Sequence, residues 1–167
     1  MQVKLAAVMP AEAMQTVTKN CGILAQAASL LNIPSVLTEQ YPQGLGATLP
    51  EIKQHLPNTK AIAKMAFSAC GEPKFNQQLQ RENIQIILAG MEAHICVLQT
   101  AFALIAAGKN VFVVEDAIIS RTPANKINAI NRLQQAGCII SNTESVLFEW
   151  LGNANHLAFK VISKLIK

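Results

Sequence analysis

One cysteine stands where a strand is expected to give way to a helix, in the stretch LAGMEAHICVLQTA at residues 88–101. The apolar run before it, IQIILAG, is typical of a strand, and the apolar residues after it fill a helix. Unpaired N–H groups and the positive end of the dipole at a helix N-terminus stabilise a thiolate. Cys96 is therefore a candidate nucleophile. The alternative is a core filler, because free cysteine is among the most buried residue types.

Lys64 is the better of two candidate partners for this thiolate. It interrupts the apolar stretch AIAKMAF near the end of a predicted strand, where an ammonium would favour a nearby thiolate and balance charge developing on a substrate. The alternative is a strand-end lysine that extends into water. His94 lies two residues before Cys96, and side chains at i and i+2 point to different sides of a helix. We therefore expect His94 at the rim of the site.

Carboxylates also fall near the ends of predicted strands, at Glu39, Glu92, Glu115 and Asp116. We interpret Asp116 as a turn or helix-capping residue. The glycines in GLG, residues 44–46, form only part of a dinucleotide fingerprint, and no phosphate-binding loop or zinc-protease motif is present. No cofactor is expected.

Alternating strands and helices must position these residues. Apolar runs predict strands at residues 33–38, 60–66, 84–89, 111–115 and 138–140. Amphipathic spacing predicts helices at residues 12–31, 49–56, 73–81, 93–107, 123–136, 143–151 and 155–166, and YPQGLGATLP is interpreted as a loop. This alternation predicts a parallel sheet covered on both faces, with the site at the carboxyl ends of the strands. Four stretches should meet there: residues 38–46, 64–68, 90–96 and 115–121.

The composition excludes several classes of function. The net charge is +4, but Lys and Arg are scattered and aromatic residues make up only 5%, so no nucleic-acid partner is expected. No uncharged apolar run approaches the ~18 residues that cross a bilayer, so no membrane partner is expected either. Four cysteines without a C-x-x-C pair argue against a disulfide framework and favour a reducing, cytoplasmic location. The opening MQVKLAAVMPAEA only loosely imitates a secretory leader, because Pro10 interrupts its short apolar part.

Several motifs in a fixed order resemble the isochorismatase-like cysteine hydrolases, particularly the isochorismatase domain-containing subgroup. They cover essentially the whole chain: TEQYPQGLG, KMAFS, GMEAHICVLQTA, VFVVEDAIISR, QAGCIISNTESVLFE and FKVISKLIK. The resemblance implies a single domain over residues 1–167 with a three-layer α/β/α fold around a mostly parallel, Rossmann-like sheet. It also implies an Asp-Lys-Cys triad, in which Cys96 matches the nucleophile and Lys64 the lysine.

Further features of the site follow from the resemblance. It implies a cis peptide between Met91 and Glu92, and an oxyanion hole formed by the backbone N–H groups of Glu92 and Cys96. The loop that carries a metal-binding Asp-x-His in nicotinamidases is TEQYPQGLG here and has no histidine, so no metal is expected and nicotinamide is disfavoured. Candidates for contact with a small-molecule substrate are Glu39, Tyr41, Phe67 and His94.

The expected reaction is metal-independent hydrolysis of a small amide or related metabolite through an acyl-enzyme on Cys96. Relatives usually form oligomers, so a homo-oligomer is expected, with the apolar C-terminal helices as one contact surface.

The triad aspartate has no counterpart in this sequence. In the family it ends an N-terminal strand as Asp-x-Gln, and Met1 and Gln2 align with the last two residues of that motif. Three explanations remain open. We favour a start placed too late in a longer protein; the alternatives are an inactive relative that binds a ligand or partner, and substitution of Glu39 or Glu92 as the base. Loss of the carboxylate would lower the rate by roughly 10²- to 10⁴-fold.

Overall fold

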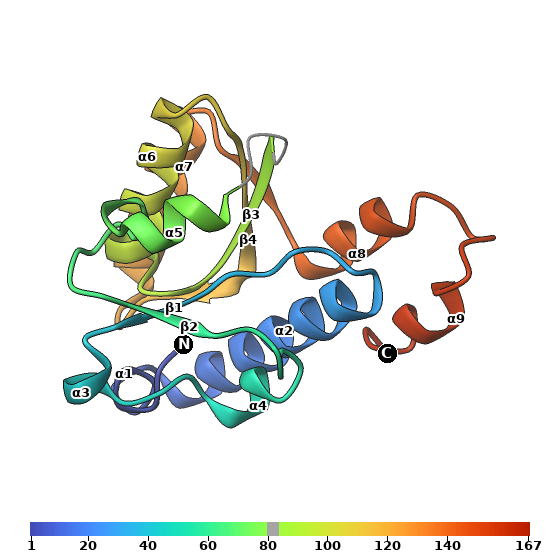
Figure 1. The fold of residues 1–167 in the computed structure, drawn as a ribbon, viewed down its shortest axis with the longest axis horizontal. Coiled ribbons are helices and arrows are strands. Elements are labelled where there is room, and N and C mark those ends of the chain that lie inside the picture. Colours follow the sequence, from blue (N-terminus) through green and yellow to red (C-terminus); the bar gives the residue numbers. More distant parts are fainter. Residues whose placement is uncertain (80–83) are drawn as a thin grey trace.

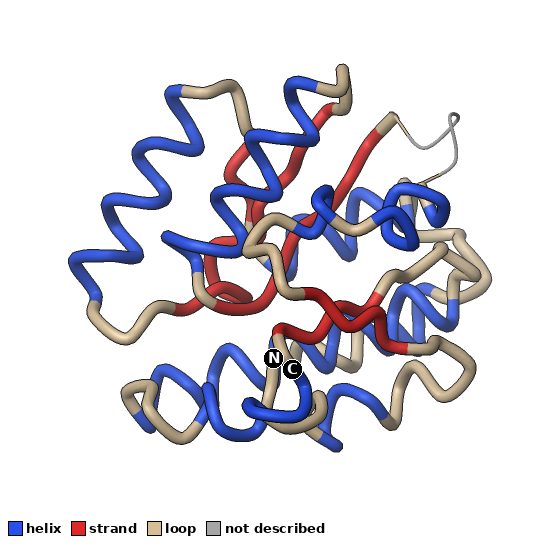
Figure 2. The backbone as a smooth tube through the Cα atoms, turned by 60° about the vertical axis from the view of Figure 1, so that its left-hand side comes forward, coloured by secondary structure: helices blue, strands red, loops and turns tan. Residues whose placement is uncertain are grey.

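Parallel strands form the centre of the molecule in the computed structural model, which describes residues 1–79 and 84–167. They are β1 (Leu37–Gln40), β2 (Ala61–Lys64), β3 (Gln85–Met91), β4 (Asn110–Ile119) and β5 (Ile139–Ser141). Each strand is parallel to its neighbours, and within the described ranges they form two sheets, β1-β2 and β3-β4-β5. Figure 2 shows these two groups of strands with helices around them.

Helices cover both faces of β4, with α2 and α8 on one side and α6 and α7 on the other (Figure 1). The larger helices are α2 (Ala11–Leu30), α6 (Leu98–Ala106), α7 (Pro123–Gln135) and α8 (Thr143–Leu151). The short ones are α1 (Val3–Ala6), α3 (Pro42–Leu45), α4 (Pro50–Lys53), α5 (Pro73–Gln78), α9 (Phe159–Ile162), the 3₁₀ turn η1 (Ala69–Gly71) and the π turn η2 (Ala93–Val97). The predicted three-layer α/β/α class is confirmed. No helix within residues 1–79 and 84–167 has the length and hydropathy to span a membrane.

The core has two halves, because successive side chains of a strand point to opposite faces. Val111 and Val113 of β4 pack in the cluster beneath α6 and α7, and Val114 packs in the cluster beneath α2 and α8. All three are fully or almost fully buried. This double burial explains why VFVV is apolar at every position.

The pairing of β3 with β4 positions the residues that follow both strands. Leu88 pairs with Val113, but Gly90 pairs with Ile118, so the register shifts between Leu88 and Gly90. Beyond the shift the two strands stay paired as far as Met91 and Ile119, so β4 runs to Ile119. The residues that follow Ile119 therefore lie beside the end of β3. The predicted strand at 111–115 was therefore too short, because a local apolar pattern does not report an irregular register.

Most of the predicted elements are present, with displaced ends. The strand predicted at 33–38 begins only at Leu37, since Pro34 has no N–H to contribute to a ladder. The interpretation of YPQGLGATLP as a continuous loop was wrong, because α3 and the first residue of α4 lie within it. For the helix predicted at 73–81, the structure has Pro73–Gln78, and residues 80 and 81 lie outside the described residues.

The last predicted helix, at 155–166, is largely wrong, since only Phe159–Ile162 is α-helical. Side chains capture backbone N–H groups before it: Asn153 Oδ1 accepts from the N–H of Asn155 at 2.9 Å, and His156 Nδ1 accepts from that of Ala158 at 3.0 Å. Such local hydrogen bonds compete with helix formation.

Candidate active site

The carboxyl ends of β1, β2 and β3 meet at Lys64, the last residue of β2. Its ammonium donates to Gln40 Oε1 at the end of β1 (2.6 Å) and lies 3.6 Å from the sulfur of Cys96, which follows β3. Arg121, after β4, binds Glu92 at 3.1 Å. The predicted convergence of four stretches is therefore confirmed.

Lys64 is buried, with only 5% of its surface exposed. Besides Gln40 and Cys96, its ammonium donates to the carbonyls of Ala66 (3.0 Å) and Phe67 (2.8 Å). The alternative of a lysine that extends into water is wrong. Among the described residues no carboxylate contacts this ammonium. The groups that contact this cation are therefore three uncharged oxygens and the Cys96 sulfur.

Cys96 lies in the π turn η2, between the end of β3 and the start of α6. π turns occur often at functional sites. The peptide bond between Met91 and Glu92 is cis, as the resemblance predicts.

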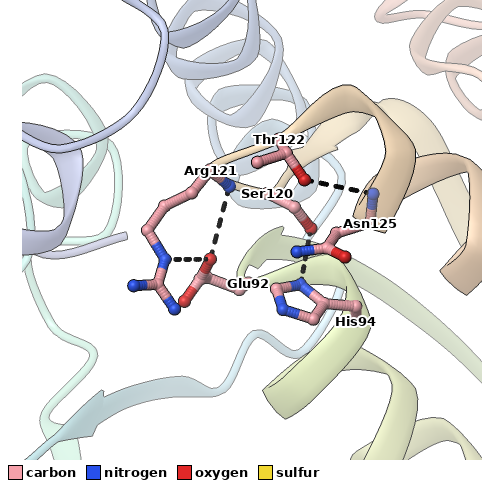
Figure 3. A network of polar contacts seen from close by, with 6 residues as sticks. All are labelled: Glu92, His94, Ser120, Arg121, Thr122 and Asn125. Carbon is pink, nitrogen blue, oxygen red and sulfur yellow. Dashed lines mark hydrogen bonds and ion pairs between the residues drawn. The ribbon is translucent and has the colours of Figure 1, made fainter.

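The side chains of Glu92 and His94 each bind a residue that follows β4 (Figure 3). The Glu92 carboxylate accepts from the Arg121 side chain at 3.1 Å and from the Arg121 backbone N–H at 3.3 Å. His94 Nδ1 lies 2.9 Å from the hydroxyl of Ser120, which is buried. Figure 3 shows the Glu92 carboxylate directed to Arg121 and the imidazole directed to Ser120. Neither side chain has a hydrogen bond to Cys96 in the described contacts.

The other candidates for substrate contact lie on the rim. Tyr41 and Phe67 both contact Lys64 through their backbones. The Tyr41 N–H donates to the Lys64 carbonyl at 2.9 Å, the Phe67 carbonyl accepts from the ammonium at 2.8 Å, and the two residues are 47% and 53% exposed. Glu39 Oε1 accepts from both the backbone N–H and the hydroxyl of Thr48, at 2.7 Å each. Tyr41 and Phe67 are thus free to contact a ligand, whereas the carboxylate of Glu39 is held by Thr48.

Two glutamines that lie at the site were not predicted from the sequence. Gln40 positions the Lys64 ammonium, and the side-chain amide of Gln2 accepts from the Gln40 N–H (2.7 Å) and donates to the Gln40 carbonyl (2.9 Å). The signal that could have identified Gln40 is the alternation of side chains along a strand, which places Gln40 on the opposite side from Glu39.

A cavity of about 660 Å³ opens beside Cys96 and Lys64 and extends between the two sheets. No group of three His, Cys, Asp or Glu side chains that could hold a metal ion occurs in residues 1–79 and 84–167. Asp116 lies within β4 rather than in a turn, and the N-cap of α8 is Asn142. The Asp116 carboxylate still binds the start of that helix, since its Oδ1 accepts from the N–H and the hydroxyl of Thr143 at 2.8 Å each.

The remaining cysteines lie in surroundings that disfavour a thiolate. Burial raises the pKa of Cys21 to about 12, and Sγ of Cys21 donates to the Ala117 carbonyl at 3.2 Å. Burial also raises the pKa of Cys70 and that of Cys138. Within the site only Cys96 has a lysine ammonium beside it in the described contacts.

Known proteins are similar to this chain in both sequence and fold. Residues 1–145 match the model of the isochorismatase domain. The chain is 42% identical over 142 residues to bovine isochorismatase domain-containing protein 2, covering 84% of this chain and 68% of that protein. It is 40% identical over 158 residues to the secreted isochorismatase effector Isc1 of Phytophthora sojae, covering 91% and 75% respectively.

Among solved structures, that of the MAR1 ribonuclease from Caenorhabditis elegans superposes with a TM-score of 0.93 at 38% identity, covering 99% of this chain and 84% of that one. The match to the family model spans most of the sequence, and the relatives agree with it. The chain belongs to the isochorismatase domain family.

Proposed function

We propose that the protein is a metal-independent hydrolase that cleaves a small amide or related metabolite through a thioester on Cys96. The contact between the Lys64 ammonium and the Cys96 sulfur, 3.6 Å in a buried setting, carries this proposal. A neighbouring ammonium converts a weakly nucleophilic thiol into a thiolate, which is the attacking species. Membership of the isochorismatase domain family supports a hydrolase fold.

The reaction proceeds in two displacements. The Cys96 thiolate attacks the carbonyl carbon, and the resulting oxyanion accepts hydrogen bonds from the N–H groups of Glu92 and Cys96. The C–N bond then breaks, the leaving amine takes a proton from solvent, and a thioester remains on Cys96. Water attacks the thioester, its hydroxyl becomes part of the carboxylic acid, its other proton returns to solvent, and the Cys96 thiolate is restored. The Lys64 ammonium stabilises the Cys96 thiolate before the attack and after the acid has left.

Exposed aromatic residues next to Lys64 favour a substrate with an apolar face. Tyr41 and Phe67, which contact Lys64 through their backbones, are 47% and 53% exposed. Aromatic rings beside a site bind apolar groups by excluding water. We therefore expect small aromatic or branched amides to bind better than positively charged ones, which the Lys64 ammonium would repel.

A catalytically inactive ligand-binding or protein-binding module is the second candidate. It is favoured by the absence, among the described residues, of a carboxylate in contact with Cys96 or Lys64. Glu92 is held by Arg121 and Glu39 by Thr48, so their substitution as the base is not supported by their contacts. Without a base, activation of the water in the second step is slow.

A panel of small amides separates the two candidates. Turnover that is lost in Cys96→Ser and retained in Cys138→Ser supports the hydrolase. Binding by thermal shift without any product supports the module. An RNA substrate belongs in the same panel, because the C. elegans relative is described as a ribonuclease. We expect no cleavage of RNA by this chain, whose cationic residues are scattered.

We also infer a reducing compartment and self-association. All four cysteines are free, which suits a cytoplasmic environment. Phe148, Leu157 and Val161, near the C-terminus, are 42%, 100% and 50% exposed, and such apolar groups commonly lie in subunit contacts. Light scattering that shows a monomer at all accessible concentrations would contradict the second inference.

A further inference from the structure

The segment that follows β2 supplies two of the three oxygens that hold the Lys64 ammonium. The carbonyls of Ala66 and Phe67 accept from it at 3.0 and 2.8 Å, and the third oxygen is Gln40 Oε1. Because the ammonium is buried, these bonds stand in for its hydration. The position of the segment after β2 therefore sets the position of the ammonium.

The Cys96 sulfur is held by a different part of the chain. Cys96 lies in η2, which continues directly into α6, whereas Lys64 ends β2. β2 pairs with β1 and β3 pairs with β4, and within the described strands no backbone ladder joins the two sheets. The distance of 3.6 Å between the ammonium and the sulfur is therefore set by contacts outside the sheets.

One hydrogen bond joins these two parts of the chain. The N–H of Ala69, at the start of η1, donates to Oγ1 of Thr100 at 2.9 Å, and both residues are buried. Thr100 lies in α6, about one helical turn after Cys96. Within residues 1–79 and 84–167, this is the only bond from a nitrogen to an oxygen between residues 64–72 and η2 or α6. Thr100 thus ties the segment that holds the ammonium to the helix that follows the sulfur.

The hydroxyl of Thr100 does more than fill space. Valine has nearly the same shape as threonine, so a valine would serve packing at this position equally well. With valine there, however, the buried N–H of Ala69 would lose its acceptor. An unpaired N–H away from water is costly, so the segment would shift until that group reached another partner. The carbonyls that hold the Lys64 ammonium belong to the same segment and would shift with it.

We propose that Thr100 is a positioning residue for the proposed hydrolysis, because its hydroxyl fixes the segment after β2 so that the Lys64 ammonium stays beside the Cys96 sulfur. This role rests on the proposed function, since it belongs to the same site. Thr100 has no hydrogen bond to the sulfur in the described contacts and acts through Ala69 and the segment before it. Loss of its hydroxyl should displace the ammonium and so lower the reactivity of the sulfur.

Two substitutions at position 100 separate the hydroxyl from the methyl group. Thr100→Val keeps the shape and loses the acceptor, whereas Thr100→Ser keeps the acceptor and loses the methyl group. The rate of Cys96 alkylation by iodoacetamide at neutral pH should fall by at least about threefold in Thr100→Val, and stay within about twofold in Thr100→Ser. Thr16→Val, at an exposed threonine of α2, is the matched control and should leave the rate unchanged. Peptide mapping of the labelled chain measures each rate.

A double variant shows whether Thr100 acts through Lys64. If displacement of the ammonium is the whole effect, Thr100→Val should change the alkylation rate little in a chain that already carries Lys64→Met. A general loosening of α6 would instead change the rate by the same factor in both chains. Amide hydrogen exchange of Ala69 provides a second measurement. This amide should exchange slowly in the unmodified chain and in Thr100→Ser, and faster in Thr100→Val.

Three results would overturn this role: an alkylation rate in Thr100→Val equal to that of the unmodified chain, an equal fold-change with and without Lys64→Met, or an Ala69 amide that exchanges freely in the unmodified chain. The last measurement needs no variant, so it decides the matter even if a substitution prevents folding. None of these readouts uses turnover. A panel of amides without product would contradict the hydrolase proposal, whereas the results above would contradict the role of Thr100.

Discussion

The ammonium of Lys64 and the sulfur of Cys96 lie 3.6 Å apart, although Lys64 ends a strand of one sheet and Cys96 follows a strand of the other. Lys64 ends β2, whereas Cys96 follows β3 in the second sheet. The contact therefore joins the two halves of the molecule across one end of the cavity. It gives the buried Lys64 ammonium a sulfur partner that can act as a nucleophile.

Cys96 should be alkylated first among the four cysteines. With its pKa raised to about 12, Cys21 holds roughly one thiolate in ten thousand at pH 8. Cys70 and Cys138 are also shifted toward the thiol by burial. Peptide mapping after brief exposure to iodoacetamide measures the order. Equal labelling of Cys70 and Cys96 would argue against an activated Cys96.

Removal of the ammonium should slow that labelling. In Lys64→Met the sulfur loses its charged neighbour, so the rate of Cys96 alkylation at neutral pH should fall by about tenfold or more. Lys60→Met, an exposed lysine just before the same strand, is the matched control and should leave the rate unchanged. An unchanged rate in Lys64→Met would remove the proposed role of this lysine.

Much of this arrangement follows from the sequence, and the exceptions have physical causes. Cys96 and Lys64 could be located because parallel strands end at one edge, and an apolar run shows where each strand ends. The role of Gln40 and the long β4 depend on an irregular register and on contacts between residues far apart in the chain. The alternation of side chains places Gln40 opposite Glu39, but no local pattern identifies the residues that Gln40 contacts. The helix predicted at 155–166 was largely wrong for a local reason. Its apolar spacing suits a helix, but the side chains of Asn153 and His156 accept hydrogen bonds from nearby backbone N–H groups and so compete with the helix.

Gly44 should be required for the position of Tyr41. A Cβ on Gly44 would overlap the Tyr41 ring, so Gly44→Ala should displace the ring from the rim of the site. Tyr41 is the only tyrosine, and a fluorine label on it should report the change by NMR. Gly22→Ala, where the nearest atom lies at an ordinary 3.5 Å, should leave the resonance unchanged. A Tyr41 signal insensitive to Gly44→Ala would show that the ring does not rest there.

Arg121 should stabilise the turn that carries Cys96. Glu92 is buried, and Arg121→Ala removes its charged partner while the backbone N–H of residue 121 remains. Because the Arg121 side chain is 56% exposed, we expect a loss of only about 1 kcal/mol in the free energy of unfolding, measured in urea. Combining Arg121→Ala with Glu92→Gln should recover part of this loss. Additive losses in the double variant would contradict the coupling.

Cys21 should make the protein less stable in alkali. Its pKa is raised from 9.0 to about 12 by burial, so above pH 9 the unfolded chain releases a proton that the folded chain retains. The free energy of unfolding should then fall by up to about 1.4 kcal/mol per pH unit between those two pKa values. Below pH 9 this contribution should be constant. Cys21→Ala should reduce the slope by that amount, and an identical slope in both proteins would contradict the assignment.

Trapping of the acyl-enzyme tests the central claim most directly. The protein is mixed briefly with p-nitrophenyl acetate at near-stoichiometric concentration, quenched in acid and analysed by peptide mass spectrometry. We predict one acetyl group on Cys96, less of it in Lys64→Met, and none at that position in Cys96→Ser. Acetylation spread over several residues, at a rate that neither substitution changes, would contradict a nucleophilic Cys96.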